Sequence, residues 1–225
     1  AEFIRIRTPL DRGIVQVNGN AGALPRDRYL GDPSRNNLHV NGDTHQFTLD
    51  HDLGQGWRTR VGASYRETDL YGEAVDLTGT LQADGRTLTR RDSWRSLPAR
   101  DTSVQAEVEG KLQTGGLRHT VLAGVESWRL FMGQDIRYST LASQPFAIDI
   151  HTPTYGQAPG NLTPGFDTRD RQRATGLFVQ DQMDLSERWK LLAGVRFDRY
   201  HQDYENRLNR TVQTQSHSAA TPRVG

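Results

Sequence analysis

The chain has 225 residues, and its 28 Lys and Arg nearly balance its 27 Asp and Glu, which leaves a net charge of +1. A charge this close to zero argues against a general binder of nucleic acid. The absence of cysteine excludes disulfide scaffolds, thiolate metal sites and cysteine nucleophiles. Mean hydropathy is −0.73, and no apolar run approaches the roughly 18–20 residues of a membrane-spanning helix. Transmembrane barrels escape this test, because their outward apolar and inward polar residues average out.

Apolar and polar side chains alternate along residues 46–53, 57–66, 103–112 and 189–198. Successive side chains of a strand point to opposite sides, so a period of two predicts strands with one apolar and one polar face. Helical periodicity is weak throughout, which indicates an all-β, antiparallel fold. We expect the charges of the polar faces to line an enclosed interior and to pair with one another or with an internal plug. These charges are Arg58, Arg60, Glu107, Glu109, Arg196 and Asp198.

The connections between these segments alternate in length. Short, mostly Gly-containing links suit hairpins and occur at 54–56, 114–116 and 184–188. Long connections, rich in Pro, Gly, Asn, Asp and Arg, are expected at 9–37, 71–97 and 139–167. A strict short–long order is typical of transmembrane barrels, which have short periplasmic turns and long external loops. A soluble β-sandwich, the alternative for such strands, would not need that order.

Aromatic residues stand near both ends of the alternating segments. Trp57 and Trp189 lie beside short links, and Tyr65 and Tyr200 lie near the opposite ends. Trp and Tyr favour membrane interfaces because their rings are amphipathic. This placement predicts aromatic girdles around a band of strands that faces lipid.

Several stretches resemble the TonB-dependent siderophore receptors. Residues 176–182 (GLFVQDQ), 189–198 (WKLLAGVRFD) and 221–225 (TPRVG) are similar to three successive strands of that family. Residues 119–126 (HTVLAGVE) resemble an earlier strand, and residues 24–33 (LPRDRYLGDP) resemble an external loop of the ferrichrome/ferrioxamine-like branch. Each motif is loose, but their order matches that of the family along essentially the whole chain.

The resemblance implies a fold for the whole sequence. Residues 1–225 would form part of a single barrel domain, with the plug and the C-terminal strands absent. The expected fold is an antiparallel transmembrane β-barrel segment, about eight strands of a 22-stranded barrel.

The resemblance also implies a function. The protein would be a receptor in the bacterial outer membrane, in contact with outer-membrane lipid, that binds a ferric siderophore at its external face. Import would use TonB-derived energy, delivered by the TonB–ExbB–ExbD complex through the absent N-terminal region. Iron would arrive as a chelate already saturated by the siderophore, so neither a protein cofactor nor a protein metal site is expected.

Aromatic residues near strand tops or in long connections are the candidates for contact with such a chelate, because their rings can pack on its apolar backbone. These candidates are Tyr71, which is the first choice, Trp94, Phe131, Tyr138 and Tyr155.

Other readings of the sequence stay open. A diffusion porin, a haem or cobalamin receptor of the same family, and a barrel for secretion or adhesion share the strand pattern. An enzyme is not expected, since no nucleophile elbow, phosphate loop or zinc-protease motif is present. His39, His45 and His51 share one side of a predicted strand, but neighbours among them stand about 20 Å apart and cannot share a metal ion.

Overall fold

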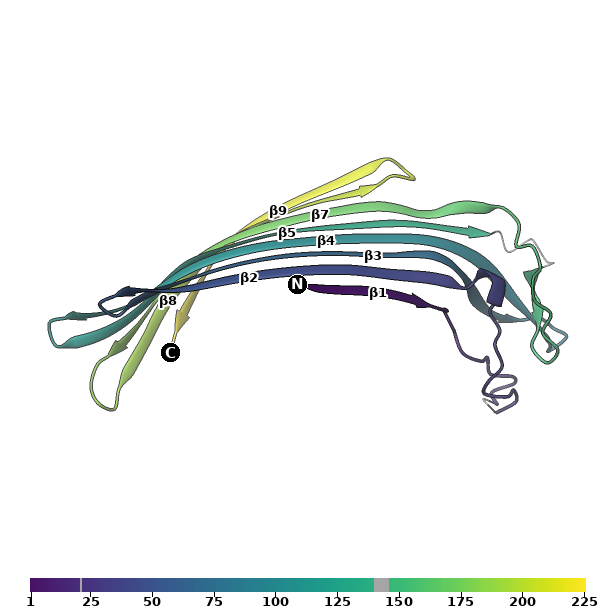
Figure 1. Cartoon of the computed structure of the whole chain (residues 1–225), viewed down its shortest axis with the longest axis horizontal. Coiled ribbons are helices and arrows are strands. Elements are labelled where there is room, and N and C mark those ends of the chain that lie inside the picture. Colours follow the sequence, from purple (N-terminus) through teal and green to yellow (C-terminus); the bar gives the residue numbers. More distant parts are fainter. Residues whose placement is uncertain (21, 140–145) are drawn as a thin grey trace.

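The computed structural model describes residues 1–20, 22–139 and 146–225, with the backbone alone for residues 79 and 80. The chain forms a long, curved sheet whose strands run the length of the molecule (Figure 1). No helix in this part of the chain is long and apolar enough to cross a membrane. The elements are β1 (Glu2–Thr8), the 3₁₀ helix η1 (Pro33–Arg35), β2 (Asn37–Gly54), β3 (Trp57–Leu81), β4 (Thr87–Thr114), β5 (Leu117–Ser139), β6 (Ile148–Asp149), β7 (Leu162–Asp184), β8 (Lys190–Asn206) and β9 (Thr211–Val224).

Each long strand pairs antiparallel with the next one along the chain. The order across the sheet is β1-β2-β3-β4-β5-β7-β8-β9, and the short β6 pairs with the start of β4. The prediction of about eight antiparallel strands is therefore confirmed. Among the described residues β1 and β9 are edge strands, so the sheet is open.

The two rims of the sheet differ, as the sequence predicted, but not at every connection. Residues 55–56, 115–116 and 185–189 make short turns at one rim. At the opposite rim, which we call the long rim, the connection between β1 and β2 spans residues 9–36, and the one between β5 and β7 is also long. Residues 140–145 of the latter lie outside the described part. Residues 207–210, for which the sequence predicted no long connection, join β8 to β9 in a tight turn at the long rim.

The prediction of a long loop over residues 71–97 is wrong. Strand β3 continues to Leu81 and β4 begins at Thr87, and the two pair in register up to Leu77 with a bulge before Leu81. Only residues 82–86 turn, because Asp84 accepts hydrogen bonds from the backbone N–H groups of Arg86 and Thr87. Similarly, β7 already begins at Leu162, inside the loop expected at 139–167.

The register carries the alternation of side chains across the whole sheet. One row of directly opposed residues consists of Val61, Ala106, Val125, Leu177 and Phe197. The adjacent row consists of Arg60, Glu107, Gly124, Phe178 and Arg196. We call the side of the first row the apolar face and the side of the second row the polar face. Large apolar side chains of the first row, such as Leu177 and Phe197, are exposed in the described chain, as expected of a surface that lipid covers.

The register corrects one residue of the expected girdles. Tyr65 shares the apolar face with Val61, but Tyr200 lies on the polar face. Its ring lies 6.2 Å from that of Trp128, centroid to centroid. Tyr200 follows Phe197 by an odd number of residues, which in a strand without a bulge places the two side chains on opposite sides.

Among the described residues, a hydrophobic core forms where other segments cover the sheet. Leu24, Leu30, Leu88, Ile148 and Ile150 form a buried cluster at the long rim. In Figure 1 the segment between β1 and β2 and the segment around β6 gather beside the ends of β3 and β4. This packing fixes the shape of the long rim.

Candidate functional site

The two long connections are held to β4 by a buried guanidinium. Arg90, which is 2% exposed, donates hydrogen bonds to the carbonyl oxygens of Phe146 (2.9 Å), Leu30 (3.2 Å) and Gly31 (2.6 Å). A further bond reaches Gln157 Oε1 at 3.3 Å. The guanidinium also lies 4.6 Å from the centre of the Phe146 ring. Arg90 therefore joins three chain segments that are far apart in the sequence.

Asp32 makes a second junction between the same two connections. Its carboxylate accepts hydrogen bonds from the backbone N–H and hydroxyl of Ser34 and from the backbone N–H of Gly156. Burial alone would raise the pKa of Asp32, but these hydrogen bonds outweigh burial and lower it. Nearby, the hydroxyl of Tyr155 donates to the carbonyl oxygen of Tyr29 at 2.7 Å.

Beside this junction, a hollow of about 440 Å³ is lined by three arginines, one aspartate and one tyrosine. We call these five residues the mouth site: Arg12, Asp76, Arg91, Arg95 and Tyr138. The register places those from β3, β4 and β5 on the same side as Arg60, Glu107 and Glu126, so the site belongs to the polar face. Ile14, Val15 and Leu77 add an apolar wall.

The mouth site carries more positive than negative charge. Asp76 bridges Arg12 at 2.8 Å and Arg95 at 2.9 Å. Arg91 instead stacks on Tyr138, with its guanidinium carbon 3.7 Å from the ring centre. The buried Nε atoms of Arg91 and Arg95 have no hydrogen-bond partner among the described residues. These donors and this ring are suited to an anionic ligand that also has an apolar surface.

The aromatic residues expected to contact a ligand do not gather in one place. Tyr138 alone lies in the mouth site. Tyr71 stacks on His39 at 5.1 Å between ring centres, and both share the side of Phe47 and the apolar face. The alternation of side chains along β4 and β5 also places Trp94 and Phe131 on the apolar face. The guanidinium carbon of Arg137 lies 5.3 Å from the Trp94 ring centre, and that of Arg171 lies 5.9 Å from the Phe131 ring centre.

The fifth candidate, Tyr155, lies in the connection after β5 at the junction with Tyr29. Four mouth-site residues, Arg12, Asp76, Arg91 and Arg95, were not predicted from the sequence. The signal for the last three was available, because extending the strand alternation of 57–66 and 103–112 through 71–97 places them on the polar face.

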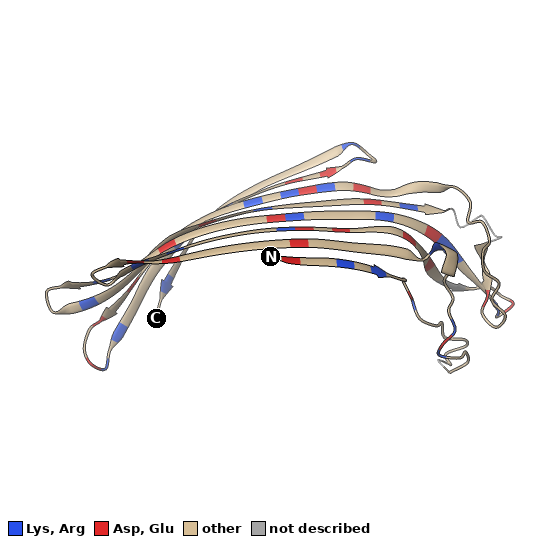
Figure 2. Cartoon of the chain, viewed as in Figure 1, with Lys and Arg blue, Asp and Glu red and all other residues tan. Residues whose placement is uncertain are grey.

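The charges expected on the polar face form ion pairs across neighbouring strands. Arg58 bridges Glu109 at 2.9 Å. Arg60 reaches Asp50 at 2.6 Å and Glu107 at 3.8 Å. Figure 2 shows basic and acidic residues interspersed along the strands. That these charges face a plug remains a prediction.

Arg196 connects β5 to β8 across the intervening strand. Its guanidinium contacts Glu126 at 2.8 Å and Asp198 at 2.9 Å. The guanidinium passes over Gly176 on β7, at a point where a Cβ would collide with it. The absence of a side chain at Gly176 therefore leaves room for this ion pair.

The contact between Arg35 of η1 and the buried Asp92 of β4 should depend on pH. Asp92 lies about 40 Å beyond Val104 along β4 at roughly 3.3 Å per residue, outside the lipid-facing band. Its side chain is 1% exposed and lies 3.5 Å from Arg35. Burial raises the pKa of Asp92 to about 6, although Arg35 opposes the shift.

A carboxyl group with a raised pKa stabilises the folded form when it is protonated. The packing of η1 should therefore weaken as pH rises from about 4, the unfolded value, to about 6. We expect amide hydrogen exchange at residues 34–36 of the full-length protein to be slower at pH 5 than at pH 8, after correction for intrinsic rates. Asp92→Asn should remove this difference, and Asp27→Asn, at an exposed site, should keep it. Equal protection at both pH values in the unmodified protein would contradict the prediction.

Comparison with known proteins gives the context of this geometry. The family model described as "TonB dependent receptor-like, beta-barrel" matches residues 2–225. The metal-pseudopaline receptor CntO of Pseudomonas aeruginosa (strain UCBPP-PA14) is 39% identical over 235 residues, which cover 100% of this chain and 32% of that protein. The ferrioxamine B receptor of Salmonella typhimurium (strain LT2) is 25% identical and covers 85% of this chain and 26% of that protein.

Solved structures are similar in fold. The siderophore receptor PiuA from Acinetobacter baumannii superimposes with a TM-score of 0.75 at 15% identity, over 99% of this chain and 35% of that one. The closed form of the ferric-catecholate import receptor Fiu from Escherichia coli K12 gives 0.74 at 16% identity, over 99% and 37%.

The chain thus spans about a third of the length of its curated relatives. Its sheet is an open segment of the antiparallel barrel wall of such proteins. Their family consists of transport receptors rather than enzymes and is found in the outer membrane. With a match over residues 2–225, the chain belongs to the TonB-dependent receptor-like β-barrel family.

Proposed function

We propose that the full-length protein is an outer-membrane receptor that binds a small anionic metal chelate at its external mouth and imports it with TonB-derived energy. The observation that carries this proposal is the mouth site, where Arg12, Arg91 and Arg95 outnumber Asp76 on the polar face of the long rim. Arginine binds carboxylate and similar oxyanions in a planar, bidentate way. Tyr138 adds a ring for the apolar part of the ligand.

The names of the relatives support a metal chelate as the class of ligand. CntO is a receptor for metal–pseudopaline, and more distant relatives are receptors for ferrioxamine B and for catecholate siderophores. The identity of 39% favours a metal–pseudopaline-like complex over the ferric hydroxamate suggested by the loop at residues 24–33. A ferric siderophore remains the second candidate within the same class.

A chelator that saturates its metal leaves no ligand position for the protein, so this proposal needs no cofactor. The partners would be the chelate, the lipid of the outer membrane and the TonB–ExbB–ExbD complex. Receptor families of this kind differ from diffusion porins in binding their cargo, and the family match favours a receptor.

The test is uptake by bacteria that lack their own metallophore receptors and produce the full-length protein. Labelled metal would be offered as the pseudopaline, ferrioxamine or catecholate complex, with haem and cobalamin as comparison cargoes. We expect saturable uptake of one anionic chelate, and its loss when TonB is deleted. Uptake that rises in proportion to concentration and does not depend on TonB would instead indicate a diffusion channel and would overturn the proposal.

A further inference from the structure

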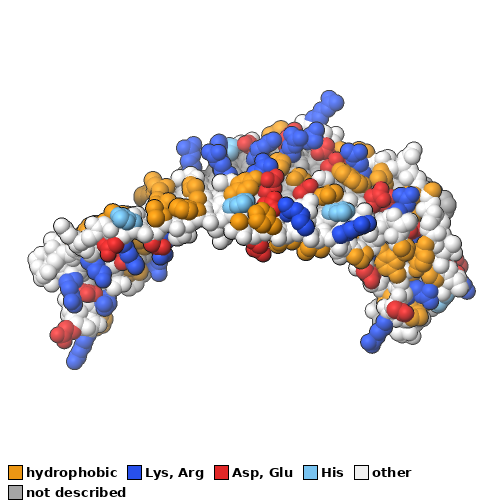
Figure 3. All heavy atoms as spheres, viewed as in Figure 1, with side chains coloured by type: hydrophobic (Ala, Val, Ile, Leu, Met, Phe, Trp, Pro, Cys, Tyr) orange, Lys and Arg blue, Asp and Glu red, His pale blue; other side chains and the backbone are white. Residues whose placement is uncertain are grey.

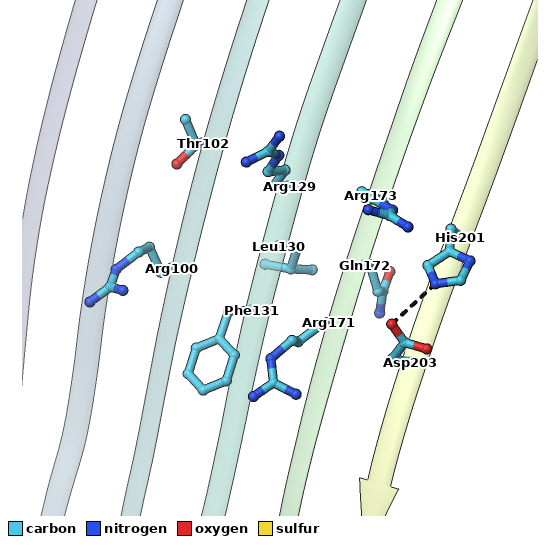
Figure 4. A pocket seen from close by; sticks show the side chains of 10 residues that line it. All are labelled: Arg100, Thr102, Arg129, Leu130, Phe131, Arg171, Gln172, Arg173, His201 and Asp203. Atoms are coloured by element: carbon cyan, nitrogen blue, oxygen red, sulfur yellow. Dashed lines mark hydrogen bonds and ion pairs between the residues drawn. The ribbon is translucent and has the colours of Figure 1, made fainter. Parts of the chain in front are cut away.

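A basic hollow lies on the apolar face, on the opposite side of the sheet from the mouth site. It measures about 620 Å³, and its lining includes Arg100, Arg129, Arg171, Arg173 and His201. Figure 4 shows these side chains rising from neighbouring strands around Phe131. In the wider view of Figure 3, basic side chains gather along the upper edge of the middle of the sheet. Charge on the side of the sheet that faces lipid is costly and needs a reason.

Within this hollow, four arginines and a histidine outnumber one carboxylate, Asp203, which lies 3.1 Å from His201. Arg129 on β5 lies directly opposite Arg173 on β7. Opposed like charges on neighbouring strands destabilise a sheet. Neither of these arginines, nor Arg199 beside them, forms a salt bridge within the part of the chain that the structure describes. Arg100 and Arg171 do pair, with Glu67 at 2.7 Å and Glu205 at 3.9 Å.

The position of the hollow along the strands matches the edge of the membrane. Val125 and Leu177 belong to the apolar row, and Arg129 and Arg173 follow on the same face toward the long rim. The separation along each strand is about 13 Å at 3.3 Å per residue. Long arginine side chains at such a height reach lipid headgroups while their stems stay on the apolar surface.

Toward the rim of short turns, the basic hollow joins an apolar one. Arg173 and His201 also line a second hollow, of about 350 Å³, together with Thr175 and Arg199. Thr175 and Arg199 in turn line a third, of about 630 Å³, whose floor includes Leu177 and Phe197. Shared residues make the three hollows one track, which leads from guanidinium groups to exposed apolar side chains. A polar head above an apolar floor has the shape of a bound amphiphile.

We propose that this track binds a phosphorylated lipid of the outer leaflet. Its phosphate would lie between Arg129 and Arg173 and relieve their repulsion, because guanidinium groups bind phosphate through paired, charge-assisted hydrogen bonds. Its acyl chains would lie over Leu177 and Phe197. Since the track and the mouth site occupy opposite faces, the lipid site is independent of the imported cargo.

The test measures binding of lipid A, a bisphosphorylated glycolipid, to the detergent-solubilised full-length protein by native mass spectrometry. Arg129→Gln/Arg173→Gln should weaken binding at least about tenfold, equivalent to 1.4 kcal/mol. The matched control Arg118→Gln/Arg188→Gln removes two charges at the rim of short turns, where both residues are exposed, and should change binding less than about twofold. Uptake of the metal chelate should be unaltered in both variants.

Two further probes separate a lipid from a free anion, and they need only the unmodified protein. Lipid A stripped of its phosphates should bind at least about tenfold more weakly, and inorganic phosphate should not compete at equal concentration. Equal binding of the stripped lipid would refute recognition of phosphate. Inorganic phosphate that binds as tightly as lipid A would refute a lipid occupant, and an unchanged affinity in the Arg129/Arg173 variant would refute the site.

Discussion

Replacing Arg90 by methionine should release the two long connections from β4. The substitution keeps much of the apolar stem but leaves the carbonyl oxygens of Leu30, Gly31 and Phe146 without their buried donor. An unsatisfied buried acceptor costs about 1–3 kcal/mol, so the three together should cost about 3 kcal/mol or more. Hydrogen exchange of the full-length protein should accelerate about 100-fold at residues 28–32 and 146–157.

Two variants make this measurement specific. Arg90→Lys keeps the charge but loses the planar fork that serves several acceptors at once, so we expect an intermediate acceleration. Arg26→Met removes an exposed arginine from the same connection and should change exchange little. If Arg90→Met left the protection of both segments unchanged, the apolar cluster of Leu24, Leu30 and Ile148 alone would hold the connections, contrary to our account.

The second large effect is expected at the mouth site. Arg91→Gln/Arg95→Gln removes two of its three positive charges while keeping polar side chains of similar length. Each hydrogen bond from a charged donor contributes about 1.5–3 kcal/mol, so affinity for the anionic chelate should fall about 100-fold or more. Titration of the full-length protein with the chelate identified by uptake would measure this loss.

The matched control is Arg207→Gln/Arg210→Gln, which removes two charges from the β8–β9 turn at the same rim. Its affinity should stay within about threefold of the unmodified protein, because general attraction across an exposed surface is weak and screened by salt. A similar loss in both double variants would mean that overall charge, and not the mouth site, binds the chelate.

The strands and their faces could be predicted from sequence because a period of two survives wherever one face is apolar. Val61, Val104 and Leu177 fall on one face by alternation alone, and the register confirms this. The extent of β3 and β4 could not be predicted in this way. Beyond the lipid-facing band both faces of the sheet are exposed to water, so apolar and polar residues no longer alternate. Residues 71–97 therefore mix Gly72, Asp84 and Arg90 and resemble a loop in composition.

The site was harder to predict than the fold for a related reason. The alternation along β4 places Arg90 on the apolar face. It is nevertheless buried, because segments about 60 residues away in the sequence fold over it. Such long-range packing leaves no local pattern. Tyr71 and Trp94 were predicted to bind a ligand because they are aromatic residues near the tops of strands. The alternation of side chains places both on the apolar face, away from Tyr138 and the mouth site.

The central claim is that the sheet has one face in lipid and the other in water. Because this chain contains no cysteine, single cysteines can be placed at Leu177, Phe178, Val179 and Gln180 of the full-length protein, with any other cysteines replaced. In membranes, the cysteines at 178 and 180 should react with a charged, membrane-impermeant maleimide, and those at 177 and 179 should resist it, because a thiol surrounded by lipid stays protonated and unreactive. Equal reactivity of all four positions with the charged reagent would contradict the account.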